Sequence, residues 1–346
     1  MAGSWGHSFP MARKGRQREQ KNSGGGSSPV RPPVVVVAGP TASGKTRLAL
    51  EIARRFQGEV VNADSMQIYD GLRILTARPE PCSQTGVPHH LFGSLDPARR
   101  GSVAGWQKAA LAVLGDIHAR GRLPVVTGGS GLYLKALMEG LAEIPEISPA
   151  GRAASRRRLD EIGAEAFHRE LQTRDPDTAA RLAPGDTQRL LRAYEVVMAT
   201  GTPLSAWQAK TLPAPPHHFA VVVLDPPRAE LHRAIEARFG EMMRAGAVEE
   251  VRALLARGLD PELPAMKALG VPALAAFLQG ELSRREAVFQ AIVATRQYAK
   301  RQATWFRHQL EEAPFRAVLR VGEKYSESLD EKIFTFIRQN LLTPDR

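Results

Sequence analysis

The chain has 346 residues, of which 43% are hydrophobic and 24% charged, with a formal net charge of +11 at pH 7. This length exceeds one typical domain of roughly 100–200 residues, and the composition excludes wholesale disorder, so we expect a large α/β unit with an added piece. The apolar runs are far shorter than the roughly 18–20 residues of a membrane span, which excludes a membrane protein. The single cysteine, Cys82, excludes an internal disulfide and a multi-thiolate zinc site, and it favours the cytoplasm.

Residues 1–33 differ in composition from the rest of the chain. The first 31 residues hold six Lys or Arg residues and one acidic residue, Glu19, and they are rich in Gly, Ser and Pro. They lack the apolar segment of a secretory signal, although an organelle transit peptide shares part of this composition. We predict a disordered basic tail, and the overall positive charge favours a polyanionic partner.

Buried strands and helices alternate over residues 34–146. Four valines at 34–37 indicate a strand buried on both faces of a parallel sheet, and a helix over 45–56 and a strand over 59–63 follow. A helix over 101–119 and a strand over 123–127 continue the alternation. This order predicts right-handed βαβ units, and therefore the first part of a doubly wound α/β core.

The strand pattern disappears over residues 147–212, which read as arginine-rich helices and predict an all-helical insertion. It resumes with a strand over 219–224 and helices over 230–256 and 284–309, so we assign residues 213–312 to the second part of the core. Residues 313–346 carry no motif, and we expect a C-terminal tail there.

The strongest motif is a phosphate-binding loop between the first strand and the first helix. It matches G-x-x-x-x-G-K-[ST] with Gly39, Pro40, Thr41, Ala42, Ser43, Gly44, Lys45 and Thr46. In such a loop the backbone N–H groups face a phosphate, Lys45 adds a charge, and Thr46 offers a hydroxyl to Mg²⁺. The motif predicts phosphate or diphosphate binding and a P-loop NTPase-like, doubly wound parallel sheet with an inserted all-helical domain.

Other polar residues are expected at the same edge of the sheet. Asp64 and Ser65 directly follow the second strand, where Asp64 could act as a general base, as an outer partner of a metal, or only as a helix cap before Met66. Residues 128–131, Gly-Gly-Ser-Gly, follow the strand over 123–127. Asp225 follows the strand over 219–224, but two prolines come next, so we interpret it as a strand terminator.

Two arginines are predicted on inward helix faces. Arg238 falls on a stripe with Leu231, Ile235 and Met242, and Arg296 falls on a second stripe with Phe289, Ile292, Ala299, Ala303 and Phe306. A buried arginine needs a carboxylate partner or a bound phosphate. A structural ion pair explains either arginine alone, whereas two of them beside a P-loop favour diphosphate binding.

Six motifs in order carry a family resemblance: residues 39–46, 64–69 (Asp-Ser-Met-Gln-Ile-Tyr), 88–91 (Pro-His-His-Leu), 128–131, 186–190 (Asp-Thr-Gln-Arg-Leu) and 295–301 (Thr-Arg-Gln-Tyr-Ala-Lys-Arg). From about residue 34 to 306 the chain resembles the bacterial tRNA dimethylallyltransferases. The resemblance implies transfer of a dimethylallyl group from dimethylallyl diphosphate to the exocyclic amine of the adenosine 3′ to the anticodon. The substrates would be tRNAs that read codons beginning with U, diphosphate would leave, and Mg²⁺ would assist.

The resemblance also implies residue roles. Asp64 would be the general base, while Lys45, Thr46 and Arg238 would stabilise the departing diphosphate and Thr46 would bind Mg²⁺. The tRNA anticodon stem-loop would be gripped by the helical insertion, and we expect the enzyme to be a monomer. Residues matching the family's tRNA contacts are Asp64, Ser65, Met66, Gln67, Ser130, Arg152, Gln188, Arg189, Leu190, Leu191 and Arg192.

The chain departs from the family pattern in places, and other functions remain open. Ser130 replaces a threonine and keeps its hydroxyl, and Asn62-Ala63 replaces a commoner Ser-Val or Ser-Ala pair, with little expected consequence. Residues 266–271 replace a segment that often carries an arginine and a Gly-Tyr pair. A P-loop kinase for small molecules or nucleotides is the alternative enzyme, and a noncatalytic RNA-binding module is the alternative from another class.

Overall fold

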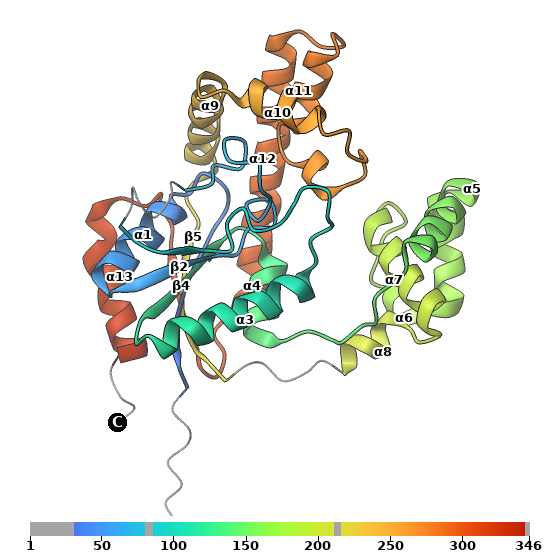
Figure 1. Ribbon diagram of the computed structural model, residues 1–346. Helices are drawn as coiled ribbons and strands as arrows, with labels where there is room; N and C mark the ends of the chain where they lie inside the picture. The colour runs from blue at the N-terminus through green and yellow to red at the C-terminus, as the bar shows by residue number, and fades with distance from the viewer. Residues whose placement is uncertain (1–30, 80–85, 211–215, 343–346) are drawn as a thin grey trace, which may run out of the picture. The chain divides into compact units, whose positions relative to one another are not determined.

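The centre of the fold is a six-stranded sheet whose order is β3-β2-β4-β1-β5-β6. The computed structural model describes residues 31–79, 86–210 and 216–342 (Figure 1). Every pair of neighbouring strands is parallel. The strands are β1 (Pro33–Ala38), β2 (Gly58–Asn62), β3 (His89–His90), β4 (Leu123–Gly128), β5 (His218–Leu224) and β6 (Arg316–Val321). The prediction of a doubly wound parallel sheet is therefore confirmed.

Strand β1 shows how both faces of the sheet are covered. Successive side chains of a strand point to opposite faces, and Val34 and Val36 pack in one hydrophobic cluster while Val35 and Val37 pack in another. The first cluster includes residues of helices α3 (Val103–Ala119) and α4 (Gly131–Glu139). The second includes residues of α1 (Lys45–Arg55) and α13 (Asp330–Ile337), which cover the other face (Figure 1).

The segment after β5 forms α9 (Arg228–Arg244), α10 (Ala247–Leu255), η1 (Pro264–Lys267), α11 (Val271–Leu278) and α12 (Arg284–Gln309). The predicted bounds of the helix over 284–309, which is α12, are confirmed. The prediction of a single helix over 230–256 is wrong, because the chain turns at Gly246, whose φ of 100° lies in the left-handed region. This turn makes α9 and α10 two separate helices.

The all-helical insertion has a hydrophobic core of its own. Its helices are α5 (Pro149–Arg174), α6 (Pro176–Ala179), α7 (Thr187–Thr200) and α8 (Leu204–Ala209). Phe167, Leu171 and Val196 are fully buried in that core. The helical character of the insertion is confirmed, while its boundary at 212 falls on residues 211–215, outside the described part.

Residues 313–346 hold more structure than the expected tail. Strand β6 pairs in parallel with β5, and after η2 (Glu327–Leu329) helix α13 buries Ile333 and Ile337. The chain continues into η3 (Arg338–Leu342). Because β6 lies at the sheet edge and reads Arg-Ala-Val-Leu-Arg-Val, it lacks the continuous apolar run that marks the central strands.

Some predictions concern residues that the structure does not describe. The basic tail predicted for residues 1–33 falls almost entirely on residues 1–30, and Cys82 lies in the gap at 80–85. Among the described residues, no helix combines the length and the apolar character needed to span a membrane.

Candidate active site

The P-loop, Asp64 and Ser130 follow the ends of three strands, β1, β2 and β4, at one edge of the sheet. Ala38 at the end of β1 is in register with Gly128 of β4, and Asn62 at the end of β2 is in register with Thr127. The chain passes closely here, because a Cβ on Gly128 would lie 2.1 Å from the backbone of Ala63. The P-loop, Asp64 and Ser130 therefore all emerge at the carboxyl ends of neighbouring strands, where α/β proteins place their ligands.

The P-loop leads directly into α1. Gly44 adopts the left-handed conformation, with φ of 93°, and the helix begins at Lys45 as predicted. Lys45 is only 9% exposed, and its Nζ donates a hydrogen bond of 3.3 Å to the carbonyl of Pro40. Burial lowers the pKa of Lys45 to about 8, although the negative charge of Asp64 opposes this shift. Lys45 thus needs an anion to hold its proton firmly.

Asp64 is held by the buried side chain of Asn62. The amide of Asn62 accepts from the Asp64 N–H at 2.9 Å and donates to the Asp64 carbonyl at 3.0 Å. Asp64 Oδ1 accepts from the Met66 N–H at 2.9 Å, but residues 65–68 form turns and not the helix that the capping interpretation assumed, while Oδ2 lies 3.6 Å from where a Cβ on Gly129 would stand. Asp64 therefore holds the turn through Oδ1 and keeps Oδ2 for a further contact, and Asn62 fixes its backbone.

Arg238 reaches the P-loop from α9. Its guanidinium donates to the hydroxyl of Thr41, and both residues line a small cavity of about 50 Å³ together with Asp64. Burial lowers the pKa of Arg238, while Asp64 opposes this shift. Ile235 and Phe239 belong to the apolar part of the same wall. The cavity thus combines a cation beside the phosphate loop with an apolar surface.

The sequence left open whether Arg296 forms an ion pair or binds a phosphate. The guanidinium of Arg296 forms an ion pair with Glu236 of α9, which supplies a carboxylate partner, while its Nε is buried without a hydrogen-bond partner among the described residues. The predicted inward stripe on α12 is correct at Ala299 and Phe306, which are buried, and wrong at Phe289, which is 66% exposed. The buried residues of this helix are Ala287, Ala291, Thr295, Ala299, Gln302 and Phe306.

Gln302 is a site residue that sequence reasoning missed. Its Oε1 accepts from the Thr41 N–H at 2.8 Å, and its Nε2 donates to the Gly129 carbonyl at 2.8 Å. Gln302 is 5% exposed and joins the P-loop to the turn after β4. A polar residue at helical spacing among the small buried residues of α12 was the signal that could have revealed it.

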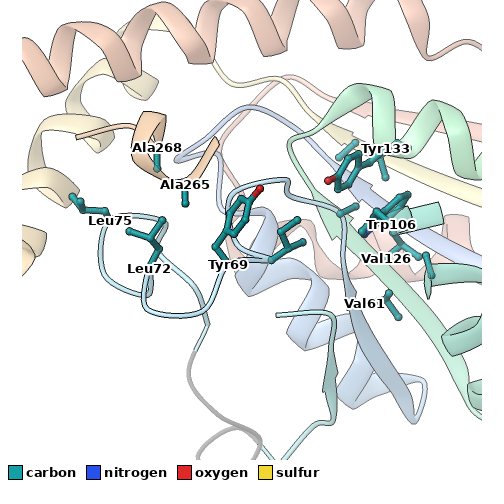
Figure 2. Packing of buried hydrophobic residues seen from close by; sticks show 14 of the residues in the cluster. Val61, Tyr69, Leu72, Leu75, Trp106, Val126, Tyr133, Ala265 and Ala268 are labelled. Carbon is teal, nitrogen blue, oxygen red and sulfur yellow. The ribbon is translucent and has the colours of Figure 1, made fainter. Parts of the chain in front are cut away.

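A larger cavity of about 410 Å³ lies next to the small one. Aromatic rings from three segments line it, namely Tyr69, Tyr133 and Trp305, and Tyr298 and Met66 line both cavities. Tyr133 stacks on Trp106 with ring centroids 4.4 Å apart, and Figure 2 shows where the two side chains lie. Tyr69 and Tyr133 are only 1% and 5% exposed, so the half-buried rings of Tyr298 and Trp305 provide the aromatic surface in this hollow on which a nucleobase can stack.

Ser65 and Ser130, both predicted tRNA contacts, bond to each other in the wall of the larger cavity. The Ser130 hydroxyl accepts from the Ser65 N–H at 2.9 Å and donates to the Ser65 hydroxyl at 3.1 Å. Gln67 is mostly buried instead, and its Nε2 donates to the carbonyl of Thr76 at 2.8 Å. The amide donor of Gln67 is therefore engaged within the protein.

A loop after β2 completes the wall of the small cavity. Glu250 of α10 accepts three successive backbone N–H groups, from Arg73 at 2.6 Å, Ile74 at 2.7 Å and Leu75 at 2.9 Å. Leu75 lines the cavity, and Figure 2 shows it close to Ala268. One carboxylate thus fixes this loop against the helices that follow β5.

The remaining predicted tRNA contacts lie in the insertion. Gln188, Arg189 and Arg192 are exposed on α7, and Leu191 is half-buried. The half-buried Arg152 donates from Nη1 to the Ile147 carbonyl at 2.7 Å. Leu190 has no exposed surface and packs in the helical core, so the prediction that it contacts RNA directly is wrong.

The donor set at the P-loop suits Mg²⁺ only if a substrate supplies further ligands. Within the described residues, no group of three or more His, Cys, Asp or Glu side chains could hold a metal ion. Thr46, at the first turn of α1, offers a hydroxyl oxygen. Mg²⁺ commonly combines few protein ligands with phosphate oxygens and waters, so this arrangement fits the ion.

Asp225 does not provide the second acidic ligand that a P-loop kinase often needs. Strand β5 ends at Leu224, as predicted, and both carboxylate oxygens of Asp225 accept from Arg307, at 2.7 Å and 3.1 Å. Asp225 therefore serves an ion pair at the end of the strand.

Comparison with known proteins distinguishes the two enzyme hypotheses. The family described as IPP transferase matches residues 67–309. A tRNA dimethylallyltransferase of Rhodospirillum centenum is 54% identical over 284 residues, covering 82% of this chain and 90% of the relative, and one of Rhodospirillum rubrum is 48% identical over 90% and 97%. These names support tRNA prenylation over a kinase.

Solved structures agree in fold. A tRNA isopentenylpyrophosphate transferase of Bacillus halodurans superimposes with a TM-score of 0.61 at 30% identity, covering 89% of this chain and 95% of that one. A eukaryotic dimethylallyltransferase acting on tRNA gives a TM-score of 0.70 at 25% identity, covering 84% and 74%. The family resemblance seen in the sequence is thereby confirmed.

Proposed function

Because the chain belongs to the IPP transferase family, we propose that it transfers a dimethylallyl group from dimethylallyl diphosphate to the exocyclic amine of the adenosine 3′ to the anticodon. The tRNAs would be those that read codons beginning with U. The observation that carries this proposal is the position of Asp64, in the wall of a small cavity that also holds Thr41 of the P-loop and Arg238.

The diphosphate binds at the P-loop. Its oxygens accept from the backbone N–H groups at the start of α1 and from Lys45 and Arg238, which both lie near Asp64. Thr46 would hold Mg²⁺, which when bound neutralises part of the charge on the diphosphate. The dimethylallyl chain lies against Ile235 and Phe239, because burying it there removes apolar surface from water.

The target base enters the larger cavity. It must leave its stacked position in the anticodon loop, and the half-buried rings of Tyr298 and Trp305 offer replacement stacking. Because Met66 and Tyr298 line both cavities, the base and the allylic carbon meet beside Asp64.

The reaction exchanges one bond for another. The amine nitrogen forms a bond to the allylic carbon, the bond from that carbon to the diphosphate oxygen breaks, and diphosphate leaves with the electron pair. Asp64 takes the proton that the amine loses. Lys45 and Arg238 stabilise the charge that develops on the leaving oxygen.

The helical insertion grips the anticodon stem through exposed side chains such as Arg189 and Arg192. These cations position the RNA backbone without reading its sequence. The enzyme acts as a monomer in the cytoplasm.

A paired assay tests the proposal. The purified protein receives Mg²⁺ and an anticodon stem-loop with adenosines at the last anticodon position and the next one, together with either labelled dimethylallyl diphosphate or labelled ATP. We expect label in the RNA only from the prenyl donor. Phosphate transfer from ATP without prenylation of the RNA would instead assign the P-loop to a kinase.

A further inference from the structure

The backbone N–H and the hydroxyl oxygen of Thr41 are both engaged by other parts of the protein. Its backbone N–H donates to Gln302 Oε1 at 2.8 Å, and its hydroxyl accepts from Arg238. In a phosphate-binding loop the free backbone N–H groups are the donors that hold the anion. The bond to Gln302 therefore withdraws one donor from the first half of the loop.

The bond also places an acceptor, the amide oxygen of Gln302, beside the Thr41 N–H. The amide oxygen of Gln302 carries partial negative charge, so a phosphate oxygen that approached the Thr41 N–H would meet an acceptor in place of a donor, whereas the Arg238 cation lies at the hydroxyl of the same residue. The donors that remain belong to the second half of the loop, to Lys45 and to the start of α1. This shortened set of donors suits two linked phosphoryl groups better than three.

Gln302 cannot easily turn away from this contact. Its Nε2 donates to the Gly129 carbonyl at 2.8 Å, so a flipped amide would set its oxygen against that carbonyl and its NH₂ against the Thr41 N–H. The side chain is 5% exposed, and its Nε2 lies 2.1 Å from where a Cβ on Gly129 would stand. The amide is thus fixed in the orientation that blocks Thr41.

We propose that Gln302 is a specificity-determining residue, which makes the loop select diphosphates over triphosphates by occupying the Thr41 N–H. This inference rests on the proposed function, because it concerns the same diphosphate site. It explains how a loop with the motif common in nucleoside triphosphate enzymes can serve a prenyl diphosphate.

Calorimetric titration with inorganic diphosphate and inorganic tripolyphosphate, both with Mg²⁺, tests the inference. We expect the wild-type protein to prefer diphosphate, and Gln302→Ala to reduce this preference about tenfold, in line with the cost of one hydrogen bond to a charged group. Gln302→Met keeps the volume of the side chain and should act in the same direction. The exposed Gln297 on the same helix provides the control, Gln297→Ala, which should leave the preference unchanged.

The outcomes separate this inference from the function on which it rests. A folded Gln302→Ala or Gln302→Met variant with the wild-type preference would overturn the role of Gln302, while the prenyl transfer assay could still succeed. If the wild-type protein bound neither anion, the proposed diphosphate site itself would be wrong. Circular dichroism and thermal melts establish which variants are folded.

Discussion

The sheet-edge site and the helical insertion hold their polar side chains in different ways. At the site, bonds join residues far apart in the chain, such as Thr41 to Gln302 and Ser65 to Ser130. In the insertion, Arg189 and Arg192 are exposed and form ion pairs three residues away on their own helix, at 3.4 Å and 3.8 Å. Exposed pairs of this kind contribute little to stability and exchange partners easily. The first region suits chemistry that needs fixed geometry, and the second suits attraction to a charged polymer.

This contrast predicts that turnover and RNA affinity can be changed separately. The largest effect should come from Asp64→Asn, which keeps the shape of the side chain but removes the base. We expect single-turnover prenyl transfer to fall about 10²–10⁴-fold, the range of general base catalysis, while filter binding shows unchanged tRNA affinity. The exposed Asp70→Asn is the matched control and should transfer normally. A large loss of tRNA affinity in Asp64→Asn would show that the two functions are not separable.

Arg238→Ala should have the next largest effect. Loss of a cation beside the P-loop should lower turnover about 10²–10³-fold, as loss of a charge-stabilising donor does elsewhere. Turnover at saturating tRNA and tRNA affinity should be measured in parallel, with Arg244→Ala, exposed on the same helix, as the control. If tRNA affinity collapsed while turnover survived, Arg238 would belong to RNA binding.

The pKa of Lys45 predicts a pH dependence. Because burial lowers this pKa to about 8, Lys45 loses its positive charge as the pH rises through that value in the free enzyme. The kcat/KM for dimethylallyl diphosphate should therefore decline above about pH 8, since this parameter reports groups of the free enzyme. Lys45→Arg stays charged and should move or remove the decline. An identical basic limb in that variant would assign the titration to another group.

Arg189→Ala should have the smallest effect, and on affinity alone. Removing one exposed cation should weaken tRNA binding modestly and reduce the slope of log affinity against log salt by about 1. Turnover at saturating tRNA should stay at the wild-type value, and Arg169→Ala, exposed elsewhere in the insertion, gives the comparison. An unchanged salt slope would place the RNA on another surface.

The parts of the fold that the sequence predicts are those with a strong local signal. Valines 34–37 and residues 219–224 have the apolar runs of buried strands, and α12 has bounds that match its periodicity. Strand β6 escaped prediction because its arginines interrupt the apolar pattern at the sheet edge. The break between α9 and α10 depends on one glycine, Gly246, inside an otherwise helical pattern.

The candidate site also contains some residues that a local signal predicts and others that it does not. The P-loop and Asp64 could be predicted because motif and strand order place them at one edge. Asn62 and Gln302 could not, since their roles come from bonds to other segments, and the bond from Gln302 to Thr41 spans 261 positions in the chain. The spacing of residues along α12 could not identify the role of Arg296, because its partner Glu236 lies on another helix, α9.

The loop at residues 73–75 resembles an anion-binding site, because it binds the carboxylate of Glu250. Three successive N–H groups converge on one anion there, as they do around phosphates in anion-binding nests, but the anion belongs to the protein itself. In the part of the chain that the structure describes, this nest with its resident anion stands beside the P-loop, for which we propose a substrate anion. Because the resident anion orders the loop beforehand, a ligand that enters the small cavity, which Leu75 lines, need not bear the entropic cost of shaping that wall.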